Sequence, residues 1–146
     1  MRNKILIIIV IILSLTYSTV SAENDTDSTI KASRYLDRYY ANIHSEGNGD
    51  VSIWFEVEAT GTMKEIGALS IRLQQRSNNS STWRTIKTYS YTEYSNMLAN
   101  DKRFYVSNVD YSGISGYSYR AYVTIWAGKD GNGDSRELLT DTIVAK

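Results

Sequence analysis

The chain has 146 residues, with 16 basic and 16 acidic side chains, one histidine, no cysteine and no proline. Without cysteine it forms no disulfide, and one histidine is too few for a zinc site built from His and Cys. Its charges are spread along the sequence rather than clustered, so neither nucleic acid nor an anionic membrane surface is an expected partner.

Residues 1–22 predict a signal peptide. Arg2 and Lys4 precede the apolar run ILIIIVIILSL at 5–15, and small residues (Val-Ser-Ala) follow before an expected cleavage at Glu23. The apolar run is shorter than the roughly 20 residues that a membrane-spanning helix needs. An uncleaved N-terminal anchor is the alternative that this pattern leaves open.

The protein expected after cleavage is secreted and has no membrane segment. Residues 23–32 are polar and acidic and predict a flexible tail. Residues 33–146 are enough for one domain. A secreted domain without cysteine must be held by its core alone, which is typical of Gram-positive bacteria rather than of small animal extracellular domains.

Short alternating segments separated by turn residues follow, which is the pattern of an all-β domain. The alternation is clearest at 51–60 and at 117–127, where apolar residues occupy every second position. The stretch TGTMKEIG at 60–67 breaks the alternation and predicts a structured loop. Strands are expected at seven places: 33–45, 51–60, 68–76, 82–91, 102–109, 117–127 and 136–144.

Seven such strands predict a single immunoglobulin-like or fibronectin type III-like β-sandwich. The stretch 71–88 predicts a hairpin with a polar tip and a tryptophan just beyond it. The stretch 116–127, GYSYRAYVTIWA, places tyrosine ahead of an alternating apolar strand, as in a tyrosine corner. Both stretches resemble fibronectin type III domains, in the hairpin of the third and fourth strands and in the sixth strand, and this resemblance implies the fold only.

A second resemblance covers nearly the whole predicted mature chain. The stretch ATGTMKEIGA at 59–68, with GNG upstream and STW and GYSYRAYVT downstream, resembles a family of small secreted proteins from Gram-positive bacteria. That family has no assigned function. The resemblance implies secretion and an all-β fold, and it brings no catalytic residues.

The sequence offers little for catalysis. His44 falls at the end of the first predicted strand, where a solvated surface position is expected. Glu56 and Glu58 share one strand face, a spacing compatible with the two carboxylates of a glycosidase, but a sandwich of this size rarely forms the deep cleft required. We therefore expect no enzymatic activity and no cofactor.

Outward aromatic residues are the better candidates for function. If the strands at 68–76, 82–91, 117–127 and 136–144 form one sheet, Arg72 stands near the aromatic side chains of the 117–127 strand. Aromatic rings with polar neighbours bind sugar rings or protein partners, although cross-strand pairing that only stabilises the sheet is the alternative. The predicted binding residues are Trp54, Tyr122, Trp126 and Arg72.

These residues predict a protein that binds an extracellular protein or a glycan. The alternative is a structural or self-associating extracellular protein, in which sheet edges or tyrosine-rich faces pair between copies.

The tetrapeptide GNGD occurs twice, at 47–50 and 131–134. Asn-Gly predicts a tight hairpin turn at each copy. The second copy also spaces oxygen-bearing side chains as in the first half of an EF-hand loop, but Ser135 stands where that loop needs glycine, and the flanking segments read as strands. It predicts a weak calcium site formed by Asp130, Asn132 and Asp134.

Overall fold

The computed structural model describes residues 33–146, and the predicted signal peptide and acidic tail lie outside them. No helix in this described part is long and apolar enough to cross a membrane. The elements are β1 Leu36–Gly47, β2 Asp50–Met63, β3 Glu65–Arg76, β4 Arg84–Ser90, the 3-10 helix η1 Ser95–Met97, β5 Leu98–Ala99, β6 Lys102–Tyr111, β7 Ser118–Lys129, β8 Asn132–Leu139 and β9 Ile143–Val144.

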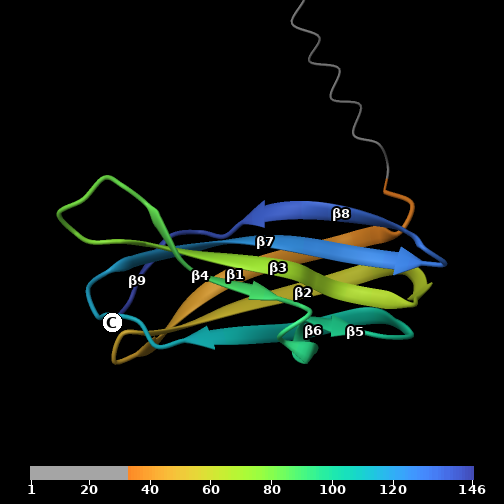
Figure 1. Ribbon diagram of the computed structural model, residues 1–146, viewed down its shortest axis with the longest axis horizontal. Coiled ribbons are helices and arrows are strands. Elements are labelled where there is room, and N and C mark those ends of the chain that lie inside the picture. The colour runs from red at the N-terminus through yellow and green to blue at the C-terminus, as the bar shows by residue number, and fades with distance from the viewer. Residues whose placement is uncertain (1–32) are drawn as a thin grey trace, which may run out of the picture. The chain divides into compact units, whose positions relative to one another are not determined.

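Two antiparallel sheets form a β-sandwich (Figure 1). One sheet has the order β1-β2-β6, and the other has the order β4-β3-β7-β8, with β5 paired to β3 and β9 paired to β7. Strand β4 pairs with β3. In immunoglobulin constant domains the fourth strand instead lies in the sheet of the first two strands. The predicted immunoglobulin-like or fibronectin type III-like β-sandwich is therefore confirmed, with nine strands in residues 33–146 instead of about seven.

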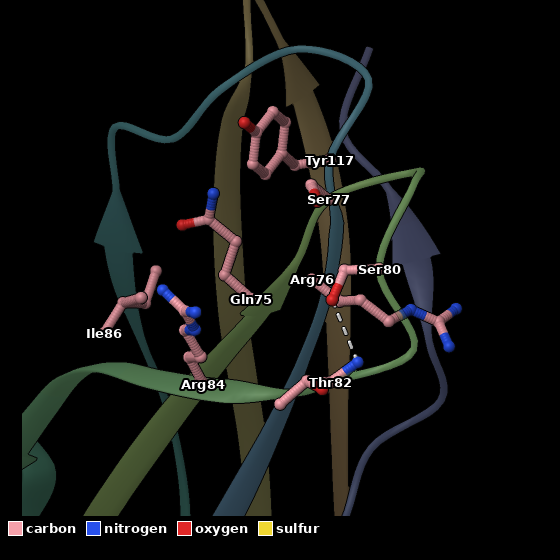
Figure 2. A pocket seen from close by; sticks show the side chains of 8 residues that line it. All are labelled: Gln75, Arg76, Ser77, Ser80, Thr82, Arg84, Ile86 and Tyr117. Carbon is pink, nitrogen blue, oxygen red and sulfur yellow. Dashed lines mark hydrogen bonds between the residues drawn. The ribbon is translucent and has the colours of Figure 1, made fainter.

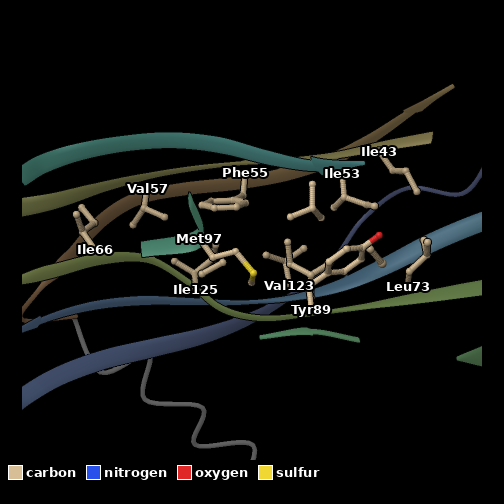
Figure 3. Packing of buried hydrophobic residues seen from close by; sticks show 14 of the residues in the cluster. Ile43, Ile53, Phe55, Val57, Ile66, Leu73, Tyr89, Met97, Val123 and Ile125 are labelled. Atoms are coloured by element: carbon tan, nitrogen blue, oxygen red, sulfur yellow. The ribbon is translucent and has the colours of Figure 1, made fainter. Parts of the chain in front are cut away.

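Alternation in β2 and β7 builds the core (Figure 3). Phe55 and Val57 of β2 and Val123 and Ile125 of β7 have no solvent exposure. Met97 of η1 is also fully buried, so the short helix closes the core beside β3. Each such side chain contributes roughly 1.5–3 kcal/mol relative to an exposed position.

The prediction of a structured loop at 60–67 is wrong. Strand β2 continues to Met63 and β3 begins at Glu65, which leaves Lys64 alone between them. Met63 and Ile66 are both buried, and the pairing of β2 with β6 shifts register after Glu58. The alternation breaks at this shift although the backbone remains extended.

The strand predicted at 136–144 is also displaced. Strand β8 begins four residues earlier and ends at Leu139, and β9 is a separate strand that pairs with β7. Between them Thr140 is buried. Its Oγ1 accepts a hydrogen bond of 2.9 Å from the N–H of Ala121. This bond turns the chain back toward the start of β7.

The predicted tyrosine corner is confirmed. Tyr119, near the start of β7, is fully buried, and its hydroxyl oxygen accepts a 2.8 Å hydrogen bond from the N–H of Ile114. A second buried tyrosine, Tyr89 of β4, donates its hydroxyl to the carbonyl of Asp110 on β6 and so links the two sheets. Burial raises the pKa of Tyr89 to about 12.

The two GNGD copies turn the chain at different residues. Asn48 and Gly49 both have positive φ between the paired Gly47 and Asp50, which confirms the first predicted turn. At the second copy the residues of positive φ are Asp130, just before the tetrapeptide, and Gly131, so the turn comes two residues before the expected Asn-Gly. Asp-Gly supplies the same backbone angles as Asn-Gly.

Candidate binding surface

The outer face of the β4-β3-β7-β8 sheet brings Arg72 and Tyr122 together. The two residues are direct cross-strand partners on β3 and β7. The guanidinium carbon of Arg72 lies 4.9 Å from the centre of the Tyr122 ring, and its Nη2 donates to Glu137 Oε2 at 2.7 Å. The predicted neighbourhood of these two residues is confirmed, and their role in binding stays a prediction.

Three further residues extend this pair into a continuous row. The guanidinium carbon of Arg120 lies 5.7 Å from the Tyr122 ring centre and 4.3 Å from that of Trp83. Arg76 lies 4.7 Å from the same Trp83 ring. We call this set the Arg–aromatic row; its members are Arg76, Trp83, Arg120, Tyr122 and Arg72.

The row is fixed by its neighbours on the sheet. Arg120 Nε donates to Gln74 Oε1 at 2.9 Å, and the amide of Gln74 lies 3.4 Å from Thr85 Oγ1. An Arg–aromatic contact contributes about 0.5–1 kcal/mol at an exposed site. Hydrogen bonds and ring contacts therefore hold the Arg120 guanidinium in one orientation, and no carboxylate of residues 33–146 pairs with it.

The tip of the β3–β4 hairpin places the outermost arginine. Figure 2 shows the hollow beneath this tip, with Gln75 and Arg84 on one side and the guanidinium of Arg76 directed to the other. The tip itself is closed by the N–H of Thr82, which donates to Ser80 Oγ at 3.0 Å (Figure 2). Arg76 therefore lines the hollow, while its guanidinium lies over the Trp83 ring.

The sequence predictions missed three members of the row. Arg120 had a usable signal, because it stands two residues before Tyr122 on the same strand face. Arg76 had the same kind of signal, because it stands four residues after Arg72 on the same face of β3. Trp83 had none, because it lies outside both strands of the β3–β4 hairpin.

Trp126 is not part of the row, and the expectation that Arg72 lies near it is wrong, because Trp126 pairs with Gly67 of β3 and Arg72 pairs with Tyr122. Its ring lies against Gly128 and Gly133, a cross-strand pair near the end of the β7–β8 hairpin, and a Cβ on either glycine would collide with it. The indole Nε1 is buried and donates to no atom within residues 33–146. The Trp126 ring therefore packs against the two glycines. The binding role predicted for Trp126 remains a prediction.

Trp54 lies on the other sheet, apart from Tyr122 and Arg72. It packs edge-on against Tyr40 of β1, with ring centres 5.9 Å apart. Exposed apolar side chains of β6 stand in neighbouring positions, since Val106 is paired with Glu56, and Phe104 with Glu58. The predicted binding residues are therefore divided between two surfaces.

The paired carboxylates near Trp54 are not equivalent. Both carboxylate oxygens of Glu58 accept hydrogen bonds, Oε2 from Arg38 and Oε1 from Arg103. Glu56 has no such partner within residues 33–146, and His44 is exposed at the side of β1. Two arginines thus engage the Glu58 carboxylate.

The residues of the predicted calcium site have other partners. Asp134 Oδ2 accepts a hydrogen bond of 2.7 Å from Ser33 Oγ and one of 2.9 Å from the N–H of Tyr35. Asn132 donates to the carbonyl of Asp130 across the turn. No group of three His, Cys, Asp or Glu residues in the described chain is arranged to hold a metal. A calcium ion would compete with both donors for Asp134, and the site stays a prediction.

We expect Asp134→Asn to destabilise the domain by about 1 kcal/mol at pH 7, because a charged acceptor binds both donors. These donors hold the pKa of Asp134 below its ordinary value. A carboxyl of lowered pKa gives stability that is present above the unfolded value of about 3.9 and is lost as the pH falls through the folded value. Urea unfolding from pH 7 to pH 3 should show the difference between the two proteins shrinking below pH of about 4.

Asp130→Asn is the matched control, because Asp130 stands in the turn and its carboxylate accepts no hydrogen bond within residues 33–146, where only its backbone carbonyl accepts one, from Asn132. It should change stability little at either pH. An Asp134→Asn effect that stayed constant down to pH 3 would contradict the assigned role of the charge.

No family model matches the chain, and no curated protein matches it. Spo0M, a sporulation control protein from Bacillus subtilis, is similar in structure at 10% identity and a TM-score of 0.41 over 75% of this chain and 50% of that one. A family 76 glycoside hydrolase from a bovine Bacteroides thetaiotaomicron strain has 15% identity and a TM-score of 0.32 over 75% of this chain and 20% of the enzyme. The chain thus spans half of the first protein and a fifth of the second, and neither similarity indicates a function. The resemblance to small secreted Gram-positive proteins stays a prediction.

Proposed function

We propose that the protein is secreted and, without catalysing a reaction, binds an extracellular partner through the outer face of the β4-β3-β7-β8 sheet. The Arg–aromatic row carries this proposal. Three guanidiniums and two aromatic rings from β3, β7 and the β3–β4 hairpin meet there. Tyr, Trp and Arg are the residues that contribute most of the binding energy at protein surfaces.

The row suits binding because its side chains are already ordered. An exposed arginine normally loses rotamer freedom when it engages a ligand, at about 0.5–1.5 kcal/mol for each side chain. Here Gln74 and the two rings already restrict Arg120. The support for a non-catalytic role is that two arginines bind the Glu58 carboxylate and that His44, the single histidine of the chain, has no hydrogen-bonded side chain beside it within residues 33–146.

A binding survey that compares the native protein with one double variant tests whether this face binds a partner. The exported protein and its Arg72→Gln/Tyr122→Ala variant are immobilised and exposed to a glycan array and to a panel of extracellular proteins. The proposal expects at least one ligand that the native protein retains and the variant releases. A ligand retained equally by both, or no ligand at all, would count against this face.

Secretion is tested separately. Antibodies raised against residues 33–146 should detect the protein in the culture medium, with a mass that corresponds to removal of residues 1–22. A full-length product that stays with the cell membrane would instead support the uncleaved anchor.

Self-association is the second candidate function, and the outer face of the β1-β2-β6 sheet favours it. Tyr40 and Phe104 are 51% and 50% exposed there, and Val106 is 36% exposed. Exposed apolar side chains gathered on one sheet face commonly mark an interface. Sedimentation velocity over a range of concentrations decides the matter: a monomer at all concentrations contradicts self-association, and a dimer lost in Val106→Lys supports it.

A further inference from the structure

We infer that the ligand of the Arg–aromatic row is an anionic polysaccharide, an inference that rests on the proposed function. The row places three positive charges along one line of the sheet surface, with one aromatic ring between each neighbouring pair. Of the three, Arg72 alone pairs with a carboxylate within residues 33–146, that of Glu137. Arg76 and Arg120 therefore carry charge that the described part of the protein leaves uncompensated.

The N–H groups along the edges of the Arg76 and Arg120 guanidiniums are available to bind an oxyanion. Within the described residues Arg120 uses only its Nε for a hydrogen bond, and Arg76 uses none of its nitrogens. A guanidinium that lies over a ring keeps its in-plane N–H groups available, and these match two oxygens of a carboxylate, sulfate or phosphate at once. The row thus offers several oriented oxyanion contacts in series, as a linear charged polymer requires.

The surroundings of the row favour a sugar polymer over a protein. Several of its neighbours on the sheet are neutral and polar, including Ser70 and Thr124, whose hydroxyls lie 3.1 Å apart, and Gln74 beside Thr85. Hydroxyl and amide groups of this kind hydrogen-bond sugar hydroxyls. At the Arg72–Tyr122 end the neighbours are instead Glu137 and the half-exposed Leu139. The centre of a protein interface is more apolar than this face, where Leu139 is an exposed aliphatic side chain beside a row that carries three guanidiniums.

Neutral glycans and nucleic acids fit the row less well. A neutral sugar or a base would stack on an aromatic face, but Trp83 and Tyr122 each already contact two guanidiniums. Proteins that hold nucleic acid tightly commonly neutralise about 6–10 phosphates, more than three arginines can match.

Direct titration with defined polymers tests the inference. Calorimetry with heparin fragments, polygalacturonate and neutral dextran separates sulfate, carboxylate and uncharged glycans. Polyglutamate and a single-stranded oligonucleotide represent acidic protein and nucleic acid. We expect binding of heparin, polygalacturonate or both, with affinity that falls steeply from about 50 mM to about 300 mM salt, and no binding of dextran.

Variants assign that binding to the row. Arg76→Gln and Arg120→Gln should each weaken it about tenfold, the effect of losing one charge-assisted contact. Arg120→Lys keeps the charge and loses the planar contact, so it should also weaken binding, which simple charge attraction would not predict. Arg38→Gln removes the same charge from the other sheet, where Arg38 pairs with Glu58, and should leave the affinity unchanged. Thermal melting confirms that each variant is folded.

Three outcomes would overturn the inference: no binding of either charged glycan at low salt, equal weakening by Arg38→Gln, or tighter binding of polyglutamate or the oligonucleotide. If the survey described above still finds a partner that the Arg72→Gln/Tyr122→Ala variant releases, the proposed function stands and only the class of ligand is wrong.

Discussion

Replacing Gly67 with alanine should lower the free energy of unfolding by about 3 kcal/mol or more, because backbone strain adds to a steric collision. Gly67 is buried on β3, where it pairs with Leu98 of β5 on one side and with Trp126 of β7 on the other. Its φ is +147°, a conformation that L side chains rarely adopt, and a Cβ there would collide with the carbonyl oxygen of Met97. Neither the sheet nor η1 has room to yield, since Met97 is itself fully buried.

Two other glycines separate the contributions of strain and collision. Gly47 has a φ of +96° with open space around it, so alanine should cost about 1 kcal/mol through strain alone. Gly61 has neither a positive φ nor a neighbour within 4 Å, so alanine should change stability by less than about 0.5 kcal/mol. Urea denaturation of the three variants should rank them Gly67, Gly47, Gly61. A Gly67→Ala loss no larger than that of Gly47→Ala would contradict the collision.

The fold could be predicted from sequence wherever side chains along a strand alternate between the core and the outer face. Phe55 in β2 and Ile125 in β7 stand in unbroken alternation, and both strands were placed within a few residues. The prediction failed at 60–67 because a register shift breaks the alternation without ending the strand. The turn at Asp130-Gly131 was misplaced because Asp-Gly and Asn-Gly lie side by side there, and local preference does not choose between them.

The candidate surface could be predicted only in part. Arg72 and Tyr122 followed from correct assignment of strands to one sheet, since the pair is cross-strand. Trp83 contacts two arginines that stand 7 residues before it and 37 after it in sequence, and only the assembled sheet brings them together. Likewise the orientation of Trp126 is set by two glycines on different strands. The charges that seemed interspersed in the sequence are therefore gathered by β-pairing.

Replacing Tyr119 with phenylalanine should lower the free energy of unfolding by about 2 kcal/mol, although it removes one oxygen atom only. The hydroxyl accepts the N–H of Ile114 in the loop that precedes β7, so the variant leaves that amide without its partner. Loss of a partner for a buried donor costs about 1–3 kcal/mol, and this bond is part-buried beside the fully buried Tyr119 ring. The ring itself stays buried, so the apolar contribution to the core should be unchanged.

Tyr111→Phe provides the comparison, since the Tyr111 ring lies 6.3 Å from that of Tyr119 and its hydroxyl has no hydrogen bond within residues 33–146. It should alter stability by less than about 0.5 kcal/mol. Amide hydrogen exchange locates the effect: in Tyr119→Phe the N–H of Ile114 should exchange faster, while the amides at the centre of β2 keep the protection expected from the new global stability. Equal destabilisation by the two substitutions would mean that the hydroxyl of Tyr119 does not anchor this loop, and that burial of its ring alone explains its position at the start of β7.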